Sequence, residues 1–165
     1  MAEYMSECST SSSSDSEFHN ENSADLSYQH LDSIPESAVS RSNEILSLQL
    51  NNNEIQKLPT SISHFHKLVT LDVSSNGMKT LCDEICHLKH IRTFVAKNNR
   101  FSENSLPKDF GLLQSLEVVN LSGNHMVRFP HQVTELSKLK CLYMGSNQMR
   151  EITGRIKHLT RYVDL

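Results

Sequence analysis

The residues of this chain that are best suited to chemistry lie in one short stretch, CDEICH, which runs from Cys82 to His87. Three more histidines, His64, His66 and His90, lie nearby in the sequence. Thiolates and imidazoles bind zinc, but a structural zinc site usually combines close cysteine pairs with two further ligands in a compact unit. The stretch lacks the further ligands that such a site needs, and the repeat described below accounts for the position of Cys82. We therefore predict no metal site and no cofactor.

Other arrangements that support catalysis are missing from the sequence. It contains only five glycines, with no glycine-rich loop to cradle a phosphate and no nucleophile elbow. No pair of carboxylates has a spacing that would bring the two groups together. The sequence therefore predicts a protein that has no catalytic residues and is not an enzyme.

A sequence pattern that occurs five times, LxxLxLxxNxL, predicts the structural elements that position these residues. It starts at residues 45, 68, 91, 116 and 139, so the steps are 23, 23, 25 and 23 residues. The pattern resembles the leucine-rich repeat family, whose repeats are about 20 to 29 residues long. The resemblance implies an α/β solenoid. Its horseshoe would have a parallel sheet on the concave face and short helical or irregular segments on the convex face.

Each unit of the pattern has two structural signatures. Apolar residues at its first, fourth and sixth positions, such as Leu68, Leu71 and Val73, predict a short half-buried strand. The ninth position is always asparagine, whose amide has donors and an acceptor that can bond the backbone of its own turn and of the next coil. We expect these asparagines to form a purely structural ladder: Asn53, Asn76, Asn99, Asn124 and Asn147.

A second apolar series follows each asparagine and is expected to line the outer arc. Proline occupies one place in this series in three units, as Pro59, Pro107 and Pro130, and Cys82 and Thr153 occupy it in the other two. Proline there fits a tight entry into a helical or irregular return. Cys82 therefore fills a structural position, which removes the main reason to regard it as a metal ligand.

The repeats divide the chain into four parts. Residues 1–23 are predicted to be a disordered acidic tail, because they are rich in serine and too poor in apolar residues to offset the entropy of ordering. Residues 24–44 are predicted to form an N-terminal capping half-repeat, residues 45–161 five repeats, and residues 162–165 the start of a sixth. No polar cap follows that unfinished repeat, so we expect the chain to be a piece of a longer array.

Charge is distributed unevenly along the chain. Residues 1–40 contain eight acidic residues and no Lys or Arg, which leaves 11 acidic against 16 basic residues in the remainder. Ser12 and Ser14 each have an acidic residue three positions later, a spacing that suits acid-directed kinases. One hypothesis is that the phosphorylated tail masks the basic solenoid or competes for it. The alternative is a tail that only aids solubility.

The sequence also favours an intracellular setting. The four cysteines are scattered through the chain and no paired cysteines flank the repeats, which suits reduced thiols. The first residues have no basic region and no apolar segment, and no stretch is long enough to form a membrane helix. We predict a soluble cytoplasmic protein with no membrane association, with the nucleus as the alternative compartment.

The strand residues that point away from the core are the candidates for binding a partner. Apolar and aromatic departures from the usual polar residues suggest an interface, because aromatic residues are favoured at binding hot spots. The alternative is that single exposed apolar residues have no special meaning. The predicted interface is a stripe of Val95, Val118 and Tyr143 edged by Lys97, with Thr93, Gln49, Asp72 and Asn120 beside it.

The basic residues are spread over both faces without interleaved aromatics, so we expect a protein partner rather than nucleic acid. The oligomeric state stays open.

Two stretches carry a closer resemblance within the leucine-rich repeat family. They are FVAKNNRFSENSLPK from Phe94 to Lys108 and SLEVVNLSGN from Ser115 to Asn124, and the preceding Leu71–Asn76 agrees as well. They resemble a longer intracellular member, over roughly residues 43–165. The resemblance implies a non-catalytic protein that binds a partner, as a signalling scaffold or as the substrate-recruiting receptor of a ubiquitin ligase. The alternative is a truncated fragment with no independent function, or one that competes with a full-length form.

Overall fold

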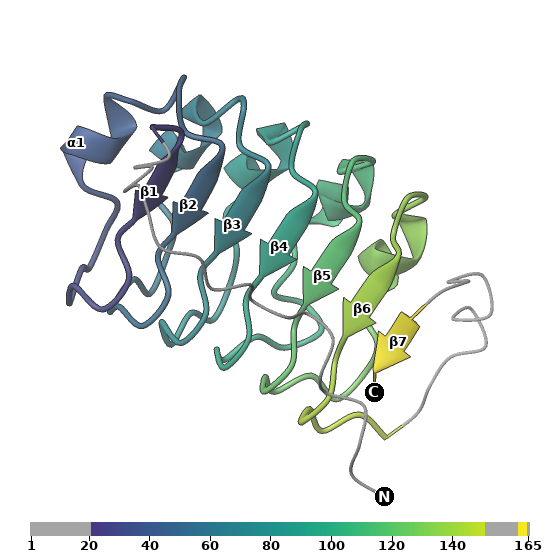
Figure 1. Ribbon diagram of the computed structural model, residues 1–165. Coiled ribbons are helices and arrows are strands. Elements are labelled where there is room, and N and C mark those ends of the chain that lie inside the picture. The colour runs from purple at the N-terminus through teal and green to yellow at the C-terminus, as the bar shows by residue number, and fades with distance from the viewer. Residues whose placement is uncertain (1–20, 151–161, 165) are drawn as a thin grey trace, which may run out of the picture.

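Figure 1 shows the computed structural model, which describes residues 21–150 and 162–164. Among these residues, seven parallel strands form one sheet in chain order. The strands are β1 (Ser23–Asp25), β2 (Ser47–Gln49), β3 (Thr70–Asp72), β4 (Thr93–Val95), β5 (Val118–Asn120), β6 (Cys141–Tyr143) and β7 (Tyr162–Asp164). The predicted tail, except for its last three residues, lies outside the described residues, and so do the candidate phosphorylation sites Ser12 and Ser14 and Thr153 at the proline position of the fifth unit.

Short helices cover the side of the molecule opposite the strands (Figure 1). They are the α-helix α1 (Glu36–Val39) and the 3₁₀ helices η1 (Thr60–His64), η2 (Asp83–His87), η3 (Lys108–Leu112) and η4 (His131–Glu135). The residue before each 3₁₀ helix is Pro59, Cys82, Pro107 or Pro130, as the proline position in the sequence predicts. In the part of the chain that the structure describes, no helix is long and apolar enough to cross a membrane.

The core lies between the sheet and these helices and runs through all the described coils. Leu68, Leu71 and Val73 are completely buried, while the intervening Thr70 and Asp72 are only partly buried. This alternation follows from the pleat of a strand, which turns successive side chains to opposite faces. Each coil therefore buries its apolar series against the next coil, and the buried residues form one continuous cluster.

Asparagine side chains join each coil to the one before it. Asn99 Oδ1 accepts the backbone N–H groups of Asn76 at 3.1 Å and Met78 at 2.9 Å. Its Nδ2 donates to the carbonyl of Val73 in the preceding coil at 3.0 Å and to that of Ala96 in its own coil at 3.2 Å. Equivalent bonds are made by Asn53, Asn76, Asn124 and Asn147.

The residue before each of these asparagines adopts a left-handed conformation. In the second, third and fourth units these residues are Ser75, Asn98 and Gly123, with φ of 55°, 55° and 66°. Asn and Gly tolerate this region better than other residues do, and a single left-handed residue turns the chain sharply. The turn aims the following asparagine back into the coil, where its amide reaches the backbone of both coils.

The third unit is two residues longer than its neighbours, and its extra length is accommodated after the sheet. Its strand remains in register with the next, since Phe94 pairs with Val119. Ser105, which is buried, fixes the longer loop by donating to the carbonyl of Lys79 at 2.6 Å and accepting from the Ser102 N–H at 2.8 Å. Phe94 packs edge to face against Phe110 with their ring centroids 5.8 Å apart, and large side chains thus fill the wider coil.

The N-terminal segment contains more structure than the predicted half-repeat at residues 24–44. Strand β1 pairs with β2, Ser23 lying opposite Ser47. Asn53 Oδ1 accepts the N–H groups of Gln29 and Leu31, each at 3.0 Å, so the first unit binds this segment as later units bind each other. Strand β1 is not evident from the repeat pattern, because this segment has Gln29 instead of asparagine at the ninth position.

Replacing Asn99 with Leu is expected to destabilise the solenoid strongly. The change leaves the backbone N–H groups of Asn76 and Met78 without their acceptor, while the carbonyl of Val73 keeps the bond from Asn76 Nδ2 at 3.1 Å. Each unpaired buried group costs about 1 to 3 kcal/mol, so the loss of two acceptors should lower the free energy of unfolding by at least about 2 kcal/mol in urea denaturation. The control is Asn104→Leu on the exposed part of the longer loop, which should change it by less than about 0.5 kcal/mol. Equal losses in the two variants would contradict the role of the asparagine.

Candidate partner-binding face

The side chains that point away from the core form two rows across the sheet. Because the parallel strands are in register, each row contains one residue from each strand. The first row is Ser47, Thr70, Thr93, Val118 and Cys141, and the second is Gln49, Asp72, Val95, Asn120 and Tyr143. All ten residues are partly buried, as expected for side chains that lie side by side on an open sheet.

The rows show how the predicted apolar stripe is arranged. Val95 and Tyr143 lie in the second row with Asn120 between them, which places them two strand spacings, or about 9.6 Å, apart. Val118 lies in the first row, between Thr93 and Cys141. The structure thus brings the three residues onto one face but not into one continuous line.

Three of the strands end in the same hydrogen-bonded turn. The last residue of β1, β3 and β5 is Asp25, Asp72 or Asn120, and its Oδ1 accepts the N–H of a serine two residues later at 3.0, 2.8 and 3.0 Å. Asp and Asn often stabilise turns in this way. For Asp25, the hydrogen bonds from Ser27 lower the pKa of its carboxyl group. Asp72 and Asn120, predicted to bind a partner, therefore also stabilise the turns that follow their strands.

The strands between them end differently. At the equivalent position β2, β4 and β6 have Gln49, Val95 and Tyr143, followed two residues later by Asn51, Lys97 and Gly145. We call a strand capped when the side chain of its last residue accepts the serine N–H bond just described. Capped strands (β1, β3 and β5) therefore alternate with uncapped strands (β2, β4 and β6). Sequence analysis recognised Val95 and Tyr143 as departures but missed the alternation, although the spacing of Asp or Asn from Ser by two residues is visible in the sequence.

Lys97 lies just beyond β4 and is exposed. With Val95 half-buried on the strand and Lys97 at its carboxyl end, β4 presents an apolar side chain next to a cation. Tyr143 adds an aromatic ring on β6. This combination of apolar, aromatic and cationic groups suits contact with a protein surface.

The cysteine stretch lies on the helical side, away from these rows. Cys82 and Cys86 are buried, and burial raises the pKa of both thiols, that of Cys86 to about 11. A raised pKa keeps a thiol protonated, whereas metal binding and nucleophilic attack need the thiolate. Within the described ranges, no three His, Cys, Asp or Glu residues are grouped so that they could hold a metal ion.

Comparison with known proteins gives matches of the same architecture. Residues 23–78 match the leucine rich repeat family. Leucine-rich repeat-containing protein 58 of Xenopus tropicalis is 40% identical over 97 residues, which cover 59% of this chain and 28% of that protein. The human protein of the same name is also 40% identical over 97 residues, with 56% and 26% covered. The chain thus spans about a quarter of the length of these relatives, and the resemblance carried by its third and fourth units is confirmed.

Two solved structures with a similar fold are bacterial proteins. A leucine-rich repeat protein of Leptospira interrogans has a TM-score of 0.65 at 22% identity and covers 84% of this chain and 46% of its own. Internalin C2 of Listeria monocytogenes has a TM-score of 0.63 at 19% identity, with 74% and 51% covered. Similarity at these identities shows the fold alone, and it confirms the predicted solenoid.

Cys86 is expected to react slowly with iodoacetamide in the folded protein near pH 8. With its pKa at about 11 instead of 9.0, the thiolate fraction falls about 100-fold, and burial further restricts access. Mass spectrometry of the digested protein measures the rate of modification. The control is the same chain unfolded in guanidinium, where Cys86 should react as fast as a cysteine in a short peptide. Equally fast reaction in the folded state would show that this thiol is accessible and ionised.

Proposed function

We propose that this chain, whose residues 23–78 match the leucine rich repeat family, is a non-catalytic module that binds a protein partner on the open face of its sheet, over β4 to β6. The family match, the parallel sheet and the solved structures with the same fold support a protein-interaction role. A curved sheet of this kind offers an extended, rigid surface whose outward residues are not needed in the core.

The observation that carries the proposal is the presence of an apolar and an aromatic residue on β4 and β6 at the position where β3 and β5 have a residue that caps the turn. Asp72 and Asn120 stabilise the turns after β3 and β5 by hydrogen bonds. At the same position β4 and β6 have Val95 and Tyr143, which cannot make the carboxylate or amide bond. An apolar or aromatic side chain at a position where Asp or Asn would stabilise the turn favours a role in recognition for that side chain.

The chemistry of the face suggests how contact would be made. Val95 and Tyr143 would pack against apolar side chains of a folded partner, about 9.6 Å apart along the sheet. Lys97 would pair with a carboxylate at the edge of that contact, where a charge improves orientation and the association rate. Thr93, Gln49 and Val118 would form the surrounding contact surface.

We also propose a more specific role for the same face. The module would recruit a partner as a signalling scaffold or as the substrate receptor of a ubiquitin ligase, in the cytoplasm or the nucleus. The thiols of Cys82, Cys86 and Cys141 are free, which supports a reducing compartment. The relatives are about four times as long as the matched region, so the activities of the longer proteins are proposals for this chain.

Replacing both Val95 and Tyr143 with Asn is expected to abolish partner capture without unfolding the protein. Asn already occupies this position on β5, so the change suits the local backbone and should alter the free energy of unfolding by no more than about 1 kcal/mol. Capture from cell extract is compared between the original chain and the variant by quantitative mass spectrometry. Proteins captured by the original chain should be lost with the double variant.

The control is Leu112→Asn, which removes a side chain that is 56% exposed on η3, on the helical side. It should leave capture unchanged. If this variant loses the captured proteins and the double variant keeps them, the binding surface lies on the helical side and the proposal is wrong.

A further inference from the structure

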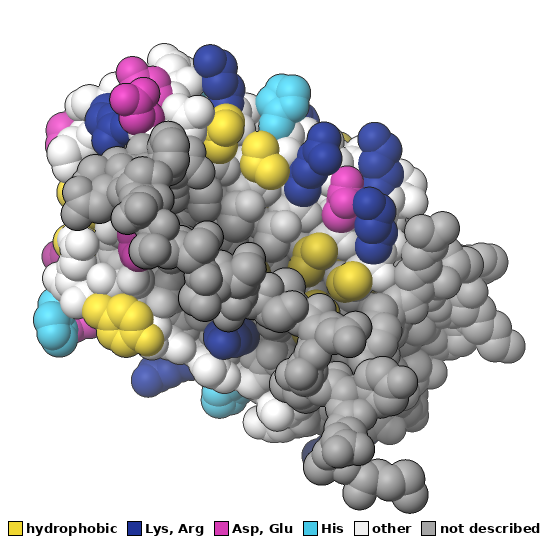
Figure 2. Space-filling model, in the orientation of Figure 1, with side chains coloured by type: hydrophobic (Ala, Val, Ile, Leu, Met, Phe, Trp, Pro, Cys, Tyr) yellow, Lys and Arg dark blue, Asp and Glu magenta, His cyan; other side chains and the backbone are white. Residues whose placement is uncertain are grey.

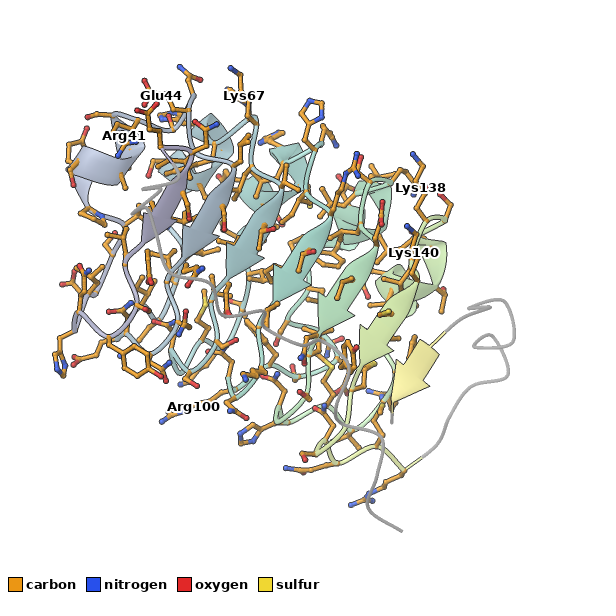
Figure 3. All side chains as sticks on the ribbon, viewed as in Figure 1. Arg41, Glu44, Lys67, Arg100, Lys138 and Lys140 are labelled. Carbon is orange, nitrogen blue, oxygen red and sulfur yellow. The ribbon has the colours of Figure 1, made fainter. Side chains whose placement is uncertain are left out.

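Basic side chains are aligned along the edge of the sheet where the strands begin. We call this set the amino-edge stripe. Lys67 immediately precedes the repeat that contains β3, and Lys89 and Arg92 lie on either side of the start of the repeat that contains β4. Lys138 and Lys140 lie on either side of the start of the repeat that contains β6. Figure 3 shows Lys67, Lys138 and Lys140 at this edge, with Arg100 at the opposite one. In Figure 2, Lys and Arg side chains gather along the same edge.

Most of the stripe has no acidic partner. Glu117 lies among these cations, held by Lys140 Nζ at 2.6 Å and by Arg92 Nη1 at 3.8 Å, and the hydrogen bond from Lys140 lowers the pKa of that carboxyl group. Glu44 lies on the same edge, one coil before Lys67, and pairs with Arg41 at 3.3 Å (Figure 3). Among the described residues, no ion pair involves Lys67, Lys89 or Lys138, all of which are exposed. With Arg41 included, six cations therefore lie along this edge beside two carboxylates, Glu44 and Glu117, and the edge has an excess of positive charge.

The chain itself contains a segment of opposite charge. Residues 1–20 include Glu3, Glu7, Asp15 and Glu17 and no Lys or Arg. They also include a run of serines, among which Ser12 and Ser14 suit acid-directed kinases. Each phosphate would add about −1.5 to −2 charges and three acceptor oxygens.

We propose that residues 1–20 dock on the amino-edge stripe and that phosphorylation of Ser12 and Ser14 strengthens this contact. The stripe would then be a regulated surface, separate from the partner-binding face proposed above. The proposal is independent of that face, since it concerns the edge of the sheet and not Val95 or Tyr143.

The dimensions of the molecule allow such docking. The first described residue, Glu21, lies next to β1, and β6 is five strand spacings away, about 24 Å. A fully extended segment of this length spans at most about 70 Å, so it can reach the whole stripe. Because the segment is tethered, its local concentration is on the order of millimolar, and weak charge pairing is enough to hold it.

Paramagnetic relaxation in the full chain tests the proposal. A nitroxide is attached to Cys8 in the Cys141→Ser background, in which Cys82 and Cys86 are protected by burial. Amide signals of Lys67, Lys89 and Lys138 should broaden, whereas those around Arg100 at the opposite edge should not. Broadening that is absent, or equal at both edges, would overturn the proposal.

Matched variants separate charge pairing from simple proximity. Replacing Lys67, Lys89 and Lys138 with Glu should abolish the broadening, while replacing Lys57, Lys79 and Lys108 with Glu changes the net charge equally and should preserve it, since these exposed lysines lie outside the stripe. Raising the salt from about 0.1 M to about 1 M shortens the Debye length from about 10 Å to about 3 Å and should also remove it. Equal loss in both lysine variants would contradict specific docking.

Two further measurements complete the test. When Ser12 and Ser14 are phosphorylated, a higher salt concentration should be needed to remove the broadening of the amide signals. An unchanged salt dependence would overturn the regulatory part of the proposal. In a mixture of spin-labelled unenriched chain and unlabelled chain enriched in nitrogen-15, the signals should stay sharp. Broadening there would mean that the segment binds a second copy instead of its own chain.

Discussion

The structure depends on one repeated interaction, the asparagine amide that bonds the backbone of two successive coils. In a solenoid no coil has enough apolar surface to fold alone, and polar backbone groups are buried wherever two coils meet. The amide of Asn99 satisfies such groups in both coils at once. The same bonds fix how far apart the coils lie and how the strands align, and the sheet follows from them.

This arrangement separates stability from recognition. The asparagine, the left-handed residue before it and the inward apolar residues hold each coil, and none of them reaches the open face of the sheet. Outward residues such as Val95 and Tyr143 can therefore vary with little effect on folding. The thiols of Cys82, just before η2, and Cys86, within it, illustrate the opposite case, since burial raises the pKa of both and so disfavours the reactive thiolate.

Much of the fold could be predicted from the sequence because each sequence repeat corresponds to one coil of the structure. Spacing gave the strand positions, and the recurring proline position gave the entry to the 3₁₀ helices. Strand β1 was missed because Gln29 replaces the asparagine, and the segment is held instead by Asn53 of the following unit. The residues of the candidate face could be named, but their arrangement in two rows depends on the register between strands, which a single sequence does not display.

The alternation of capped and uncapped strands gives the molecule two different periods. The scaffold repeats with every coil, whereas the side-chain cap of the turn after the strand recurs with every second coil from β1 to β5, about 9.6 Å along the sheet. Exchanging the outward residues of adjacent coils would preserve the architecture and change what the surface presents. Exchanging those of coils two apart would keep both the architecture and the order of capped and uncapped strands, so the smallest repeating unit of that order is a pair of coils.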